Sequence, residues 1–163
     1  MPTPLFPGRF QPFHQGHLMV IQGMVKTAGN PIIVICDPLK ADSTGADMFT
    51  LEERREMISA ALLSADIMDA TIVTCKDAER DGDWVNYVLD AAEKRHDVVV
   101  WSGREDVRSA CEASGIPTKK IVPVPGVDGA ILRDQMCSGN GEWRKKVPAG
   151  ALDVIEEALA RKR

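Results

Sequence analysis

The sequence predicts an α/β fold, a Rossmann-like, doubly wound parallel sheet of five strands with C-terminal helices. Short apolar runs of strand length alternate along the chain with longer segments whose apolar residues recur at helical spacing. The run at residues 32–36 is continuously apolar, which is typical of a strand whose sheet is covered on both faces. Ligands of such sheets bind beyond the carboxyl ends of the strands, so candidate site residues should directly follow strands.

Five segments are expected to form the strands of this sheet. The first contains a difficulty, because Pro4 and Pro7 flank Leu5 and Phe6, and proline lacks the N–H that a central strand donates. Either this strand is very short, or both prolines lie where no ladder hydrogen bond is needed. The five expected strands are residues 2–6, 32–36, 70–75, 97–101 and 121–124.

The segments between the strands are expected to be helices, and residues 37–48 a loop. Thr50, with Glu53 three residues later, predicts a capping box at a helix start. Gly29 and Gly115 should end two other helices, because glycine readily adopts the left-handed conformation that follows a last turn. Besides the helix that begins at Thr50, the expected helices cover residues 17–26, 83–94, 105–114, 130–137 and 149–160.

Length and composition indicate one ordinary globular domain spanning residues 1–163. Hydrophobic residues make up 44% and charged residues 27% of the chain, and the net charge is −4. This balance provides no global basic field for nucleic acid or a membrane surface, so neither is expected as a partner. The four cysteines show no CxxC or zinc-site spacing and are expected to be reduced thiols in a cytoplasmic protein.

The strongest functional signal lies between the first expected strand and the first expected helix, at residues 8–17, GRFQPFHQGH. A helix N-terminus at this point would present unpaired backbone N–H groups that suit a phosphate. Gly8 allows close approach of the backbone to a ligand, and Gly16 allows a tight turn. His14 and His17 are three residues apart across that turn, so both imidazoles can face one anion, and Arg9 adds a permanent charge.

These residues resemble the nucleotide-binding motif of the archaeal-type nicotinamide mononucleotide adenylyltransferases, within the HxGH nucleotidylyltransferase superfamily. Further segments across nearly the whole chain resemble the same family. These are residues 49–54 (FTLEER), 83–85 (DWV), 100–103 (VWSG), 129–136 and 141–144 (GEWR).

The resemblance implies that AMP is transferred from ATP to nicotinamide mononucleotide, with Mg²⁺ bridging phosphate oxygens. The implied catalytic residues are Arg9, His14, His17 and Arg133, which would stabilise charge on the phosphates. ATP and a phosphate-bearing small molecule are the expected partners, and a homo-oligomer is expected. No residues are assigned as metal ligands. The full implied ATP site comprises Gly8, Arg9, Phe10, His14, Gly16, His17, Ser102, Gly103, Ile131 and Arg133, and the implied acceptor site comprises Phe13, Trp84 and Arg104.

The chain departs from the family pattern at three places. Arg104 replaces an asparagine, Asp128 and Ala130 replace a serine and a threonine, and residues 36–40 differ from the usual loop after the second strand. Arg104 would repel the cationic ring of nicotinamide mononucleotide if it faced that ring. Three alternatives therefore stay open, namely a cytidylyltransferase, an adenylyltransferase with another phosphate-bearing acceptor, and a non-catalytic nucleotide-binding module. A dehydrogenase is disfavoured because no GxGxxG follows the first expected strand.

Overall fold

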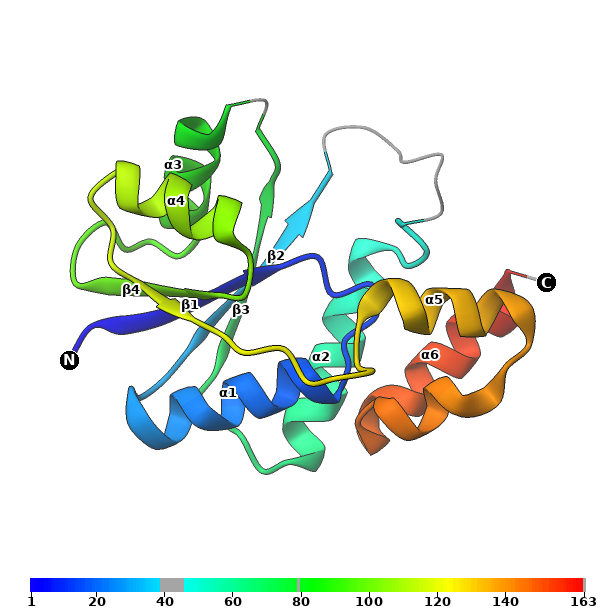
Figure 1. Ribbon diagram of the computed structural model, residues 1–163. Helices are drawn as coiled ribbons and strands as arrows, with labels where there is room; N and C mark the ends of the chain where they lie inside the picture. The colour runs from blue at the N-terminus through cyan, green and yellow to red at the C-terminus, as the bar shows by residue number, and fades with distance from the viewer. Residues whose placement is uncertain (39–45, 79, 163) are drawn as a thin grey trace. The chain divides into compact units, whose positions relative to one another are not determined.

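The computed structural model describes residues 1–38, 46–78 and 80–162 (Figure 1). The chain divides into two compact units, named here the sheet unit and the helical unit. The sheet unit consists of Met1–Arg9, Val20–Lys40 and Asp69–Val122. The helical unit consists of Phe10–Met19, Ala41–Met68 and Pro123–Arg163. The loop at residues 36–40, which differs from the family pattern, lies partly outside the described residues. The structure describes its first three positions.

The sheet unit contains five parallel strands in the order β3-β2-β1-β4-β5. This order confirms the predicted Rossmann-like α/β fold, because β1 is central and the chain winds outward from it in both directions. The strands are β1 (Thr3–Gly8), β2 (Ile32–Asp37), β3 (Thr71–Lys76), β4 (Val98–Ser102) and β5 (Thr118–Lys120).

The central strand β1 accommodates both prolines without losing a paired hydrogen bond. Pro4 has a register partner in β4 alone, and Pro7 has one in β2 alone. Successive N–H groups of a strand point to opposite neighbours, and the N–H of Thr3 donates to the carbonyl of Asp97 on the β4 side. The backbone nitrogen of Pro4 therefore points towards β2, and that of Pro7 points towards β4. Each proline nitrogen thus faces the strand with which that proline has no register partner. The second of the two expected explanations is correct, and the strand extends to Gly8.

The fifth strand was predicted at the wrong residues. Thr118–Lys120 pairs with β4, whereas the apolar residues 121–124 follow the strand. The error arises because β5 is an edge strand, and edge strands commonly carry lysine rather than a continuous apolar run. Pro123 also lacks the N–H needed to extend the pairing. The fourth strand begins one residue later than predicted, because Asp97 has a positive φ of 59°.

Two helices cover one face of the sheet, α3 (Asp81–Ala91) and α4 (Glu105–Ala113) (Figure 1). The predicted end of the first at residue 94 is too late, since Glu93 already has a φ of 56°. Gly115 follows α4 with a φ of 77°, as predicted for a helix stop. The buried core between these helices and the sheet consists of Leu5, Ile32, Val34, Cys36, Val85, Val88, Leu89, Ala92, Val98, Val100 and Cys111.

Helix α1 (Gln15–Thr27) begins in the HxGH motif. It ends as predicted at Gly29, which has a φ of 100° and donates its N–H to the carbonyl of Met24 at 2.9 Å. None of the described helices is both long enough and apolar enough to span a membrane. All four cysteines lie in the described part of the chain and are thiols rather than disulfides, as expected.

The helical unit is built around α2 (Leu51–Ser64) and α6 (Ala149–Arg161), which pack against each other. Gly150 allows this close packing, because a side chain there would clash with the carbonyl of Ala60. Between them in sequence lie α5 (Gly129–Ser138) and the 3-10 helix η1 (Gly141–Lys146), which was not predicted. The predicted capping box at the start of α2 is confirmed.

Candidate active site

The two histidines of the HxGH motif cap the start of α1 by bonding each other. The backbone N–H of His17 donates to Nδ1 of His14 at 3.3 Å, and the backbone N–H of His14 donates to Nδ1 of His17 at 3.1 Å. His14 stands at the cap position and His17 at the third helical position. The arrangement is therefore a capping box in which imidazoles take the places of the usual hydroxyl and carboxylate.

This capping arrangement fixes where each ring carries its proton. A backbone N–H can only donate, so both Nδ1 atoms are acceptors and the proton of each neutral ring is on Nε2. Burial lowers the pKa of His14 to about 4, against a weaker opposing effect of the nearby Asp128 carboxylate. Burial, together with the neighbouring His14, also lowers the pKa of His17 well below its usual value. Both rings are thus neutral Nε2–H donors at pH 7.

Aromatic rings hold this histidine pair in place. The two imidazoles are stacked, with their centroids 3.6 Å apart. Phe13 stacks on His17 at 5.4 Å, and the edge of Phe10 meets the same ring at 4.8 Å. Phe10 and Phe13 are almost completely buried, at 2% and 0% exposure. The structure therefore places both phenylalanines as packing partners of His17. Phe10 was expected to contact the nucleotide and Phe13 the acceptor.

Gly16 makes room for the His14 ring. A Cβ at this position would lie 2.9 Å from Cε1 and 3.1 Å from Nδ1 of His14. The ring cannot move away easily, because it is stacked on His17. The need for glycine here therefore comes from the imidazole and not from a left-handed turn conformation, since the residue has no positive φ.

Gln11 links Arg133 to the loop that carries His14 and His17. Gln11 was not among the residues predicted from the sequence. Its side chain is buried and bonds both backbone groups of Phe49: Nε2 donates to the carbonyl at 2.9 Å, and Oε1 accepts from the N–H at 2.7 Å. Arg133, on α5, donates from Nη1 to the carbonyl of Gln11 at 2.7 Å. Gly129 leaves room for this contact, because a Cβ there would lie 3.0 Å from the Arg133 guanidinium. Gln11 resembled an ordinary loop residue in sequence, and no local signal distinguished it.

A carboxylate caps the start of α5. The Asp128 side chain accepts from the N–H groups of Ala130 at 2.7 Å and Ile131 at 3.4 Å. The residues that replace the family's serine and threonine thus form a conventional helix cap here. Because its charge also acts on His14, Asp128 brings a negative charge close to the histidine pair. The Ile131 side chain is exposed.

In the sheet unit, the predicted nucleotide residues Ser102 and Gly103 lie at the carboxyl end of β4. The Ser102 hydroxyl accepts from the N–H of Arg104 at 3.1 Å, and its carbonyl accepts from Arg108 at 3.0 Å. Arg104, the expected acceptor contact, is exposed and bonds Asp106 through two nitrogens, at 3.1 and 2.7 Å. Its charge is therefore offset by a neighbouring carboxylate.

Other predicted residues of the sheet unit also lie at or near strand ends. Gly8 is the last residue of β1, and Arg9 follows it and forms an ion pair with Asp77, just after β3. Trp84, on α3, is partly buried and packs against the core of the unit. The structure thus shows Trp84 as a packing residue, in addition to the acceptor contact expected of it.

Within the described residues, no three histidine, cysteine, aspartate or glutamate side chains gather as a metal site. A divalent cation that accompanies a nucleotide is held chiefly by phosphate oxygens, so such a cation belongs to the substrate rather than to the protein.

Comparison with known proteins decides the family. Residues 5–122 match the model of a family described as cytidylyltransferase-like. The chain is 32% identical over 152 residues to the nicotinamide-nucleotide adenylyltransferase of Methanolobus tindarius, covering 92% of this chain and 85% of the relative. A protein of the same name from Sulfurisphaera tokodaii is 32% identical over 161 residues, covering 94% and 90%.

The chain belongs to the nicotinamide-nucleotide adenylyltransferase family. A solved structure with the same fold is the bifunctional NMN adenylyltransferase/ADP ribose pyrophosphatase from Francisella tularensis, complexed with AMP and a manganese ion. It matches with a TM-score of 0.72 at 19% identity, over 99% of this chain and 53% of that one. This member of the adenylyltransferase family thus spans about half the length of that solved chain, and the likeness concerns the fold.

Proposed function

We propose that this protein transfers the AMP group of MgATP to nicotinamide mononucleotide, forming NAD and pyrophosphate. The observation that carries the proposal is the histidine pair, whose mutual hydrogen bonds leave both rings neutral with the proton on Nε2. Two preorganised N–H donors at the start of a helix suit the charge that develops on a transferring phosphoryl group. Family membership supports the choice of donor and acceptor.

The reaction needs no nucleophile from the protein. An ionised phosphate oxygen of the acceptor attacks the α-phosphorus of ATP and forms a new P–O bond. The bond between that phosphorus and the bridging oxygen breaks in line, and the electron pair leaves with pyrophosphate. Catalysis therefore consists of positioning the two substrates and stabilising negative charge on the phosphates.

The helical unit is proposed to supply the phosphate-binding groups. Nε2–H of His14 and of His17 would donate to phosphate oxygens in the transition state. Arg133 would bind the terminal phosphates, with the backbone of Ile131 nearby at the start of α5. Its present bond to the carbonyl of Gln11 leaves other guanidinium N–H groups to donate, since arginine carries five. Gly16 would keep the ring of His14 in place.

The sheet unit is proposed to supply groups for the nucleoside and for the acceptor. Ser102 and Gly103 would bind the adenine and ribose, Gly8 would allow close approach of the nucleotide, and Arg9 would assist at the phosphates. Arg9 is held by Asp77 in this structure and would exchange that partner for phosphate. The exposed part of Trp84, with Arg104, would contact the acceptor. Phe10 and Phe13 would act through His17.

A divalent cation, Mg²⁺ by proposal, would enter with ATP and neutralise charge on the departing pyrophosphate. The manganese ion and AMP named for the Francisella tularensis structure support a divalent cation beside the nucleotide. We also propose that residues 1–163 form one nucleotidylyltransferase domain, which works in the cytoplasm as a homo-oligomer. The four thiols support a reducing compartment, and light scattering would measure the oligomeric state.

The test of the proposed function is pyrophosphate release from ATP, CTP, GTP or UTP, each combined with a panel of phosphate-bearing acceptors. ATP with nicotinamide mononucleotide should give the highest kcat/KM, and NAD should appear in equal amount to pyrophosphate. Release of pyrophosphate with another acceptor and none with nicotinamide mononucleotide would overturn the assignment of the acceptor. Failure with every pair would instead support a non-catalytic nucleotide-binding module.

A further inference from the structure

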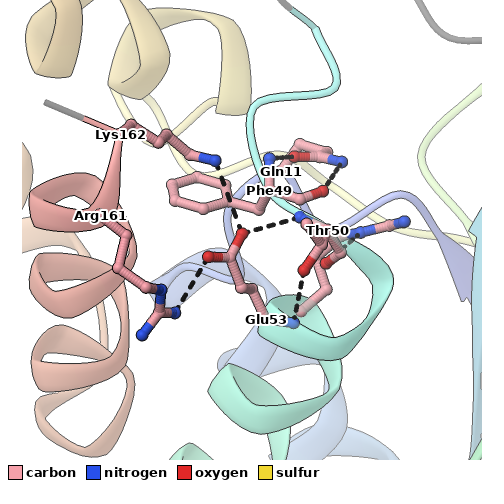
Figure 2. Close-up of polar contacts among 7 residues, drawn as sticks. Gln11, Phe49, Thr50, Glu53, Arg161 and Lys162 are labelled. Atoms are coloured by element: carbon pink, nitrogen blue, oxygen red, sulfur yellow. Dashed lines mark hydrogen bonds and ion pairs between the residues drawn. The ribbon is translucent and has the colours of Figure 1, made fainter.

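A buried carboxylate at the start of α2 binds two cations from the end of α6. Glu53 is 8% exposed, and its Oε2 accepts from Arg161 at 3.0 Å while Lys162 lies 3.7 Å from Oε1 (Figure 2). Oε1 also accepts from the backbone N–H of Thr50 at 2.9 Å. Burial alone raises the pKa of Glu53, but the Thr50 N–H and the two cations outweigh that effect and hold the pKa below its usual value. The carboxylate is therefore charged at neutral pH.

Gln11 binds the backbone of Phe49, the residue directly before this capping box. Phe49 adjoins Thr50, and both its backbone N–H and its carbonyl are bonded to the Gln11 amide (Figure 2). The Lys162 ammonium also lies 5.9 Å from the centre of the Phe49 ring. A shift of Phe49 would therefore break two buried hydrogen bonds of Gln11, and buried amides left without partners are costly.

Gln11 in turn lies in the loop that places the histidines. Its neighbour Phe10 and the nearby Phe13 both pack on the ring of His17. Its carbonyl is the atom that Arg133 binds. A continuous set of contacts within the helical unit thus runs from the end of α6 to the histidine pair.

We propose that Arg161 and Glu53 are positioning residues for the reaction, acting through Phe49 and Gln11 to hold the loop that carries His14 and His17. This inference rests on the proposed function of that loop. The Arg161 and Lys162 side chains are 58% and 40% exposed, and ion pairs with such exposed partners contribute little to folding stability. Loss of these ion pairs should therefore lower turnover more than it lowers the free energy of unfolding.

The primary variant is Arg161→Met, which removes the charge and keeps most of the side-chain length. We expect kcat to fall about tenfold, since small displacements of catalytic groups are costly, while the KM for ATP changes less than about twofold. Arg161→Lys keeps the charge and should restore most of the turnover. The control is Glu156→Gln, on the same helix as Arg161. This change breaks an ion pair with Arg144 of η1 without touching Glu53, and should leave kcat unchanged.

A second measurement, made without substrate, is the imidazole ¹⁵N spectrum of His14 and His17. Arg161→Met and Glu53→Gln should shift the Nδ1 signals, because the loop that holds both rings is displaced, whereas Glu156→Gln should not. If Arg161→Met matches Glu156→Gln in both kcat and spectrum, the positioning role is wrong. Shifted Nδ1 signals in a protein that shows no transferase activity would support the positioning role while refuting the proposed function.

Discussion

The backbone N–H groups of His14 and His17 donate to each other's Nδ1 atoms, at 3.1 and 3.3 Å. One pair of residues thereby completes a helix cap and sets the tautomer of two rings. In both rings the remaining nitrogen, Nε2, must carry the proton. The local structure at the start of α1 and the proposed chemistry consequently depend on the same two side chains.

The low pKa values of the two histidines predict a stability that depends on pH. Their pKa values lie below 6.5 in the folded protein, so the unfolded chain binds more protons between about pH 4 and 6.5. Stability is therefore complete above pH 6.5 and falls as the pH decreases, by about 1.4 kcal/mol per pH unit for each histidine. Guanidinium unfolding at pH 7 and 5.5 measures this slope, which should be smaller in His14→Asn. Equal stability of the native protein at both pH values would contradict the buried neutral pair.

Gly16→Ala should lower both kcat and Tm, because its Cβ would lie 2.9 Å from the His14 ring. The matched control is Gly23→Ala in the same helix, where an added Cβ meets nothing within 4 Å. That change should stabilise the protein by about 0.5–1 kcal/mol, since alanine favours a helix interior over glycine. If the two variants behave alike in activity and in thermal unfolding, the proposed reason for glycine at position 16 is incorrect.

Asp128→Asn should strengthen ATP binding. Asparagine retains an oxygen that can cap α5, but it removes the negative charge that acts on His14. The KM for ATP should decrease about fivefold, the scale of one partly screened charge interaction. Asp134→Asn, an exposed change on the same helix, should leave the KM unaltered. An increase of the KM in Asp128→Asn would show that this carboxylate assists nucleotide binding.

The pairing of Arg104 with Asp106 predicts how the acceptor is chosen. Because Asp106 offsets the guanidinium charge, Arg104→Asn should change the ratio of kcat/KM for nicotinamide and nicotinic acid mononucleotide less than about threefold. Asp106→Asn releases that charge and should shift preference towards the more anionic nicotinic acid mononucleotide. A large gain for nicotinamide mononucleotide in Arg104→Asn would mean that Arg104 faces the cationic ring unpaired.

The fold could be predicted where local patterns determine it. The continuous apolar run of β2 and the Thr50 capping box are visible in sequence because burial and capping each demand particular residue types. The edge strand β5 was misplaced because Thr118–Lys120 carries charged residues and is defined by its neighbour β4 alone. The prolines of β1 could be explained only by register, which depends on strands distant in sequence.

The sequence selected the histidine pair as candidate site residues but not the residues that support it, and the structure brings the two imidazoles together. The HxGH spacing placed two imidazoles together, but their mutual capping depends on backbone geometry that spacing alone does not specify. Gln11 was missed because its partners Phe49 and Arg133 are 38 and 122 residues away in sequence. Phe10 and Phe13 were expected to contact the nucleotide and the acceptor. Their burial and their ring contacts in the folded protein show that they pack on His17.

The most direct test of the account is the rate of pyrophosphate release by His17→Ala with saturating MgATP and nicotinamide mononucleotide. Loss of one preorganised donor to the transferring phosphate should lower turnover by about 10²-fold or more, while cooperative folding is retained. The exposed His96, replaced in the same way, provides the control and should keep full activity. A folded His17→Ala protein that turns over within about threefold of the native rate would contradict the central role of the histidine pair.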